Sequence, residues 1–429
     1  MRNTLLLATC LITLPAWLPA QQIRVLKVKS PILDIQDGDR LLEGVWRVDP
    51  TIPLDVYDAQ RSSLQRRVTF VGDGGSLSFD VEPGRTYDFA IEVDGKPACI
   101  TRISTMTQPF TRTASAPANG PIAMPITVSR GKLHLQGAIN GVDGIDLILD
   151  TGASVGGVYP GGVAKGVALQ FDGSVENRAT GGTTVRRKSS DNTLEIAGLR
   201  WDHECLLEFD LLFDGADAIV GMGLFDGHVV ELDFERMLLT VHDQVPAHAA
   251  AFAATPMHFV GDLPAIDVVF GDEAGTASGV FVIDTAGNGA MFVNRAFAAA
   301  HDLFQRLPSE GTSTSTGLGP DAITNDVVKV PSLTIAGMKL QDVPIHVARN
   351  SPTDEPPGGV VCMDVLQRGH WLIDYPRRQV LWKANSLAAT PIPLRLAWPR
   401  WWLVGGGAAL LALVVLAVSL ARRRRRRGE

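Results

Sequence analysis

The residues best suited to catalysis in this 429-residue chain are two aspartates, each followed by a threonine. Asp150-Thr151-Gly152 follows the apolar run 147–149, and Asp284-Thr285-Ala286 follows the apolar run 281–283. An apolar run that ends in a small polar turn is typical of a buried strand leading into a loop. Two carboxyl groups held together can share one proton, so that one serves as general base and the other as general acid. The pair therefore predicts acid–base chemistry on a water molecule.

Both aspartate segments lie in a frame that repeats along the chain. Three further pairs of segments match at a nearly constant offset: 194–199 with 333–338, 219–224 with 360–365, and 227–234 with 369–375. A shared order and spacing of this kind indicates a duplicated domain, here of about 120–130 residues per copy. Each copy consists of short apolar runs separated by Gly, Asn and Asp turns, such as 132–135 and 145–149 around the turn 140–144. The sequence therefore predicts an all-β, bilobal architecture.

This combination resembles the retropepsin-like branch of the aspartic peptidases over about residues 121–385. The resemblance is carried by Asp150-Thr151-Gly152-Ala153, by the glycine-bearing segment 180–182 and by Ile219-Val220-Gly221. It implies a bilobal aspartic-peptidase fold in one chain, with one catalytic aspartate from each lobe. The function it implies is that of an endopeptidase whose Asp150/Asp284 dyad activates a water to hydrolyse peptide bonds. A peptide or protein is then the expected substrate, and no cofactor is expected.

The resemblance also implies roles for residues around the dyad. Thr151 and Thr285 are expected to hydrogen-bond across the lobes, and Gly152 is expected to let the two loops approach closely. The position equivalent to Gly152 in the second lobe is Ala286, which completes the loop-support set. Glycine-bearing hairpins are expected to close over the substrate as flaps. The flap candidates are Thr180, Gly181 and Gly182 in the first lobe and Thr316 and Gly317 in the second.

The second copy departs from the family pattern at two positions. Ala286 stands where glycine is expected, and Cys362 stands where Gly221 lies in the first copy. A methyl at position 286 is tolerated if φ is negative, whereas a positive φ costs about 1 kcal/mol and shifts the loop. These departures leave an alternative open, in which the chain is a catalytically inactive pseudopeptidase that binds peptides or proteins in the bilobal cleft.

Both ends of the chain carry apolar segments. Residues 1–20 are typical of a secretory signal peptide. The uncharged segment 401–421 is long enough to cross a bilayer, and the Arg-rich tail 422–429 follows it. The positive-inside rule then predicts a single-pass anchor in the cell membrane, with a cytoplasmic tail and a periplasmic or cell-surface catalytic part. A buried core helix and a bacterial sorting tail are the two other interpretations of the C-terminal segment.

The remaining domain boundaries follow from composition. Residues 21–103 contain two hairpin signals, at 72–75 and 94–96, and predict a small β-sandwich-like domain. The predicted order after it is a linker at 104–120, lobe 1 at 121–245, an inter-lobe linker at 246–256, lobe 2 at 257–385 and a juxtamembrane linker at 386–400.

Charge and metal-ligand patterns argue against other functions. The net charge is −7 although six arginines lie together near the C-terminus, so a nucleic-acid surface is not expected. No histidine lies at metal-ligand spacing from cysteine or acidic residues, so no metal site is expected. His228 and His370 repeat at matching positions and are interpreted as structural. Cys205 and Cys362 are interpreted as apolar groups and not as a disulfide or a nucleophile.

Overall fold

The structure is a computed structural model that describes residues 23–396, with short gaps at 39, 52–53, 60–65, 83–84, 106–109, 212–214, 273–274 and 352–357. Strands dominate the described residues and the helices are short, as the sequence predicts. No helix within these ranges is long and apolar enough to cross a membrane. The predicted signal peptide 1–20, transmembrane helix 401–421 and tail 422–429 lie outside the described residues.

The chain divides into two compact units, and the first comprises residues 1–59 and 65–106. Two four-stranded sheets form it. One sheet contains, in order, β1 (Arg24–Val28), β7 (Thr86–Val93), β8 (Lys96–Ser104) and β4 (Leu54–Asp58). The other contains β3 (Arg40–Arg47), β2 (Ile32–Asp37), β5 (Arg66–Gly72) and β6 (Gly75–Val81). Both predicted hairpins are confirmed, as β5–β6 and β7–β8. Phe70 and Phe89 are fully buried in the core of this unit and contact one another.

The second unit comprises residues 60–64 and 107–429 and contains both predicted lobes. Lobe 1 is built on one sheet with two short helices, α1 (Pro160–Ala164) and η1 (Met222–Phe225). Its strands, in sheet order, are β11 (Thr127–Ser129), β12 (Lys132–Ile139), β13 (Val142–Asp150), β18 (Ala218–Gly221), β14 (Gly156–Val158), β17 (Leu199–Glu208), β16 (Gly182–Ile196) and β15 (Gly173–Ala179). The predicted linker 104–120 contains a further strand, β9 (Thr111–Arg112), which pairs with β17.

Lobe 2 repeats the strand order of lobe 1. Its strands, in sheet order, are β22 (His258–Val260), β23 (Leu263–Asp272), β24 (Gly275–Ile283), β29 (Gly359–Val361), β25 (Met291–Val293), β28 (Met338–Ala348), β27 (Ile323–Ile335) and β26 (Ser309–Ser315). Its helices are α2 (Arg295–Ala300), α3 (Leu303–Arg306) and α4 (Met363–Leu366). Strands β13 and β24, which lead to the two aspartates, occupy equivalent places. The predicted duplication is thereby confirmed at the level of topology.

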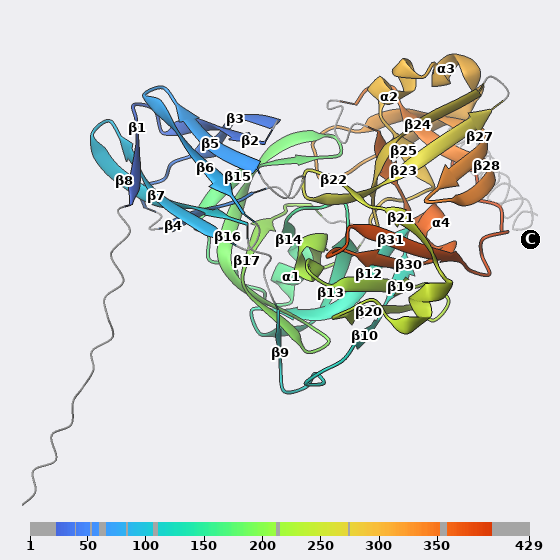
Figure 1. Cartoon of the computed structure of the whole chain (residues 1–429), viewed down its shortest axis with the longest axis horizontal. Helices are drawn as coiled ribbons and strands as arrows, with labels where there is room; N and C mark the ends of the chain where they lie inside the picture. The colour runs from blue at the N-terminus through green and yellow to red at the C-terminus, as the bar shows by residue number, and fades with distance from the viewer. Residues whose placement is uncertain are drawn as a thin grey trace, which may run out of the picture. The chain divides into compact units, whose positions relative to one another are not determined.

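A six-stranded sheet joins the lobes, with three strands from each half of the unit. In order it contains β10 (Ile122–Pro125), β20 (Leu238–His242), β19 (Val229–Asp233), β30 (Gly369–Asp374), β31 (Gln379–Ala384) and β21 (Ala253–Pro256). The central pair, β19 and β30, is antiparallel and comes from different lobes. In Figure 1, β30 and β31 run between the strands of lobe 2 above and β12, β13, β19 and β20 below. The predicted linker 246–256 contains the helix η2 (Ala247–Ala251) and β21 of this sheet.

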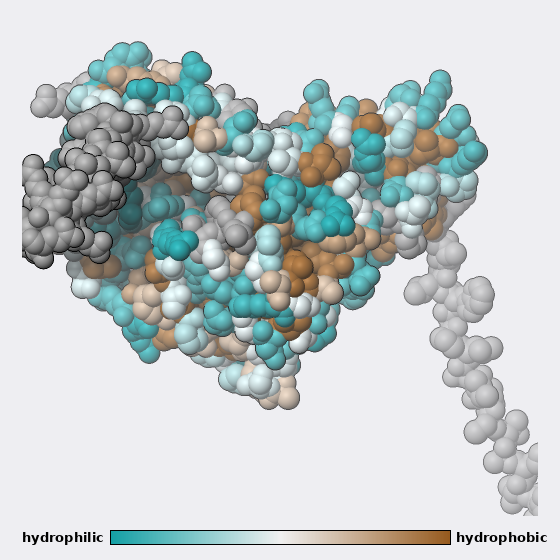
Figure 2. Space-filling model, turned by 180° about the vertical axis from the view of Figure 1, so that it is seen from behind, coloured by the Kyte–Doolittle hydropathy of each residue, from teal (hydrophilic) through white to brown (hydrophobic). Residues whose placement is uncertain are grey.

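One hydrophobic cluster runs through both lobes and the joining sheet, so the two lobes share a core. Residues just beyond lobe 2, predicted as a juxtamembrane linker, also pack on that lobe. The guanidinium of Arg368 donates to Thr390 O, and Arg395 pairs with Asp364. On the face shown in Figure 2, hydrophobic residues form separate patches among hydrophilic ones.

Candidate active site

Buried strands bring the two aspartates to equivalent loop positions. Asp150 is the last residue of β13, and it lies opposite Gly221 in the parallel pairing with β18. Asp284 directly follows β24, and its N–H donates to Val361 O at 2.9 Å. The apolar run before each aspartate is almost fully buried, which anchors the strand and leaves the polar turn at its end. At each aspartate, an apolar run forms a buried strand and the polar turn after it forms a loop. The strand holds the loop, and with it the carboxyl group, in place.

The threonines after the aspartates link the two loops reciprocally. Thr151 N donates to Thr285 Oγ1, and Thr285 N donates to Thr151 Oγ1, each at 3.0 Å. Each hydroxyl then donates to the opposite strand, Thr151 to Ile283 O at 2.5 Å and Thr285 to Leu149 O at 2.6 Å. Both threonine side chains are completely buried. Four hydrogen bonds in a dry interior hold the aspartate loops in one register relative to each other.

The two carboxyl groups lie next to each other beside Gly152, close enough for the charge of one to act on the other. Asp150 Oδ1 accepts from Gly152 N at 2.8 Å, and Asp284 Oδ1 accepts from Ala286 N at 2.8 Å. Asp284 also accepts from the N–H of Gly287, so it has one more backbone donor than Asp150. Protein surrounds both groups closely, yet each residue keeps some solvent exposure. A water can therefore reach a pair of carboxyl groups that the loops hold in place.

Burial raises the pKa of both carboxyl groups, because it disfavours the charged form. The negative charge of Asp284 raises the pKa of Asp150 further, to well above its ordinary range. Backbone donors at Ala286 and Gly287 counteract the rise in the pKa of Asp284. The pair thus favours a single shared proton that resides on Asp150, with Asp284 as the acceptor.

A buried lysine acts on both aspartates. Lys132 is the first residue of β12, and it is only 6% exposed. Its positive charge lowers the pKa of Asp150, of Asp284 and of the Cys362 thiol. β12 is also bonded to the second loop, because Leu133 N donates to Thr285 O at 2.9 Å. Sequence reasoning missed Lys132, since nothing in its local pattern distinguishes it from an exposed strand lysine.

One of the two departures in lobe 2, Cys362, forms a structural exchange with Gly287. In lobe 1, a Cβ on Gly221 would lie 2.5 Å from Ala153 O, so the residue facing that loop must be glycine. In lobe 2, a Cβ on Gly287 would lie 2.5 Å from Cys362 Sγ and 2.8 Å from Asp284 Oδ2. The glycine of this contact is therefore Gly221 in lobe 1 and Gly287 of the aspartate loop in lobe 2. The side chain of Cys362 fills the space beside Gly287.

Ala286 fits the same arrangement. Its φ is negative, so the backbone strain expected for a left-handed alanine is absent there. Its methyl packs against a small hydrophobic cluster that includes Ile148, Tyr159 and Ile219. The backbone N–H of Ala286 still donates to Asp284. Neither Ala286 nor Cys362 displaces the second aspartate from its partner.

The five flap candidates lie at the tips of two hairpins. Thr180 and Gly181 connect β15 to β16, which begins at Gly182, and Thr316 and Gly317 follow β26 before β27. The tips are bonded to each other: Gly319 N donates to Thr180 O at 3.0 Å, and Asp321 N donates to Gly181 O at 2.9 Å. The hairpins of the two lobes therefore meet tip to tip.

Close backbone contact explains the glycines at these tips. Gly181 has φ +94°, and a Cβ there would lie 2.2 Å from Asp321 O. A Cβ on Gly317 would lie 2.6 Å from the side chain of Thr180. Arg186 of the first hairpin adds a side-chain contact, because its guanidinium donates to Leu318 O at 3.4 Å and pairs with Asp210. Leu318 packs against the same cluster as Ala286, which connects the second tip to the aspartate loops.

Among the histidines and cysteines singled out in the sequence, Cys362 lies beside the second aspartate loop, whereas His228 and His370 contact other residues. Cys99, Cys205 and Cys362 form no disulfide in the described part of the chain, and burial raises the pKa of Cys362 well above its ordinary value. The ring of His228 stacks on Phe110 with centroids 4.5 Å apart. His370 lies in the joining sheet and contacts Glu231.

Comparisons with known proteins give a likeness to solved structures. No protein-family model matches the chain, and no curated protein sequence matches it. Among solved structures, the chain is similar to the crystal structure of an aspartic proteinase from Irpex lacteus, with 11% sequence identity and a TM-score of 0.43. The match covers 63% of this chain and 99% of that chain. A likeness at this level carries no functional conclusion, which comes instead from the geometry of the site.

Proposed function

We propose that this protein is an aspartic endopeptidase that hydrolyses peptide bonds through Asp150 and Asp284. One observation carries the proposal: two neighbouring carboxyl groups, one from each lobe, lie on loops joined by the reciprocal hydrogen bonds of Thr151 and Thr285. A dyad of this kind can move protons to and from a water without a metal ion or a covalent nucleophile.

The proposed reaction begins with the proton on Asp150. Asp284 accepts a proton from water as the water oxygen attacks the peptide carbonyl carbon, and Asp150 donates its proton to the carbonyl oxygen. The resulting gem-diol collapses when Asp284 passes its proton to the amide nitrogen. The C–N bond then breaks, and a gem-diol hydroxyl returns a proton to Asp150. The aspartates exchange roles within each cycle, and the pair ends in its starting protonation state.

The two hairpins favour a retropepsin-like enzyme in which both lobes supply a flap. A peptide substrate is proposed to lie between the aspartate loops and the hairpin tips. The bonds from Gly319 to Thr180 and from Asp321 to Gly181 must then open to admit it. Glycine at the tips supports such a movement, since it permits backbone conformations that other residues resist.

The sequence near the two ends of the chain supports a cellular location for the enzyme. We propose that it is anchored in the cell membrane through residues 401–421, with its catalytic part on the extracytoplasmic side. The support is the sequence alone: a signal-like N-terminus, an uncharged C-terminal segment and the arginines that follow it. Peptides or proteins of the periplasm or cell surface are then the substrates.

The experiment that tests the activity uses the full chain and a denatured protein substrate at acidic pH. Cleavage that pepstatin blocks, and that Asp150→Asn and Asp284→Asn each abolish, is the expected result. Asp267→Asn is the matched control, because Asp267 is an exposed aspartate on β23 of lobe 2. If the wild type and both dyad variants cleave equally, the peptidase proposal fails. If none cleaves but all retain a bound peptide, the chain is the inactive peptide-binding protein instead.

A further inference from the structure

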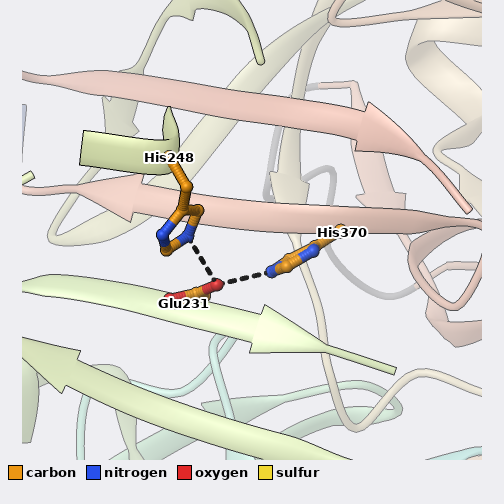
Figure 3. A group of neighbouring side chains, drawn as sticks. All are labelled: Glu231, His248 and His370. Atoms are coloured by element: carbon orange, nitrogen blue, oxygen red, sulfur yellow. Dashed lines mark hydrogen bonds and ion pairs between the residues drawn. The ribbon is translucent and has the colours of Figure 1, made fainter. Parts of the chain in front are cut away.

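Three histidines converge on one buried glutamate in the sheet that joins the lobes. Glu231, on β19, is 8% exposed. Its Oε1 lies 2.6 Å from His370 Nε2 and 3.0 Å from His248 Nε2, as Figure 3 shows. Its Oε2 lies 2.6 Å from His242 Nε2. All three imidazoles present the same ring nitrogen to the carboxylate.

The four residues come from four separate elements. Glu231 and His242 lie on neighbouring strands of lobe 1, β19 and β20. His248 lies on η2 between the lobes, and His370 lies on β30 of lobe 2. The cluster therefore ties both halves of the joining sheet to the segment that connects them. Sequence spacing could not reveal it, because only folding brings these elements together.

The separations match what a transition-metal ion requires. The ligand atoms of Glu231, His248 and His370 all lie within 4.8 Å of one another. Zinc–nitrogen bonds of about 2.0–2.1 Å in a tetrahedron place neighbouring ligand atoms about 3.3–3.4 Å apart. The observed nitrogen–oxygen separations of 2.6 and 3.0 Å need to open by well under 1 Å. The side chain of His248 is 51% exposed, which gives an ion a path to the site.

The surroundings suit a bound cation. Asp233 Oδ2 lies 3.9 Å from His370 Nδ1, the ring nitrogen that does not face Glu231, and a carboxylate in this position is common behind metal-binding histidines. Neutral imidazoles with one carboxylate are ligands that zinc, copper, nickel and iron prefer, whereas magnesium and calcium prefer oxygen. Glu231 and Asp233 together carry two negative charges to balance a divalent ion.

We propose that Glu231, His248 and His370 form a binding site for one divalent transition-metal ion of the zinc type, while His242 holds the other carboxylate oxygen of Glu231. The ion clamps β19, η2 and β30 and thereby stabilises the joining sheet. This site lies on a different sheet from the aspartate loops, so the inference does not depend on the peptidase proposal.

The test uses the full chain after removal of metal with a chelator and dialysis. Zinc is added, and the bound metal is measured by elemental analysis and calorimetry. Cobalt replaces zinc as a spectroscopic probe, because its visible absorption reports tetrahedral coordination. His248→Gln and His370→Gln are compared with His258→Gln and His203→Gln. The control histidines each form a pair with one carboxylate, Asp267 or Asp191, without further histidines at that carboxylate.

One zinc per chain is expected, with intense cobalt absorption and a higher unfolding temperature in excess zinc. His248→Gln and His370→Gln should each weaken zinc binding by about tenfold or more, and the control variants should bind as the wild type does. His248 is half-exposed, so its replacement leaves the fold intact and keeps the test decisive. The proposal is overturned if the chain retains no zinc, or if both cluster variants bind zinc as tightly as the controls do.

Discussion

Cys362 occupies the space that a side chain at position 287 would need. A Cβ on Gly287 would lie 2.5 Å from the Cys362 sulfur, a separation that real atoms do not adopt. In lobe 1 the pair is reversed, with Ala153 on the loop and Gly221 on the strand. The apparent loss of the family pattern in lobe 2 is therefore a compensated exchange, and Asp284 keeps its place beside Asp150.

The exchange predicts strong coupling between positions 287 and 362. Gly287→Ala alone should lower the free energy of unfolding by about 1–3 kcal/mol, because the added methyl overpacks the loop. Cys362→Gly alone should also destabilise, since it leaves a void beside the loop. The double variant should recover about 0.5–3 kcal/mol relative to the sum of the single effects. Urea unfolding followed by tryptophan fluorescence measures this, and strictly additive effects would contradict the exchange.

The shared proton predicts how peptidase activity depends on pH. Activity needs one proton on the pair, so it falls at low pH when both carboxyl groups are protonated and at high pH when Asp150 ionises. Burial raises the pKa of both groups, and Asp284 raises that of Asp150 further. The alkaline limb of kcat/KM should therefore lie well above the ordinary pKa of aspartate. A limb at that ordinary value would show that the carboxyl groups are not coupled in the active enzyme.

The same raised pKa predicts a cost in stability at neutral pH. The folded chain holds the Asp150 proton to higher pH than the unfolded chain does, so this stabilisation is present in acid and lost as pH rises. Asp150→Asn removes the charge and should raise the unfolding temperature at neutral pH. The gain should shrink below the ordinary aspartate pKa. The unfolding temperatures of the wild type and of Asp150→Asn are measured at neutral pH and at a pH below the ordinary aspartate pKa. A gain in unfolding temperature that is the same at both would argue against a raised pKa of Asp150.

The buried lysine predicts a shift of the pH profile. Lys132 lowers the pKa of both aspartates through its charge, so Lys132→Met should move the alkaline limb of kcat/KM to higher pH. Lys339→Met is the matched control, because Lys339 is an exposed strand lysine in lobe 2. An unchanged limb in Lys132→Met, with activity retained, would assign the lysine a packing role only.

The hairpin tips predict a specific requirement for glycine. Gly181→Ala should lower kcat/KM by about tenfold or more, because its Cβ would collide with Asp321 O and separate the tips. Gly166→Ala is a matched control: Gly166 also has a positive φ, +105°, but a Cβ there meets nothing within 4 Å. The control carries the same kind of backbone strain without the collision. Equal losses in both variants would attribute the effect to strain and not to tip contact.

The sequence by itself determined the duplicated β frame and the two Asp-Thr turns. These are local patterns, since an apolar run that ends in a polar turn specifies a strand and its loop wherever the chain folds. The resemblance to the aspartic peptidases also implied flap hairpins at 180–182 and 316–317.

Only the tertiary structure decided how these pieces meet. The bonds between Thr151 and Thr285, the exchange between Gly287 and Cys362, and the contact of the hairpin tips all join residues far apart in the chain. The charge of Lys132 near the dyad and the histidines around Glu231 depend in the same way on strand pairing, within lobe 1 for Lys132 and across the lobes for His370. Spacing along the chain carries no record of such contacts, because packing in three dimensions selects which side chains become neighbours.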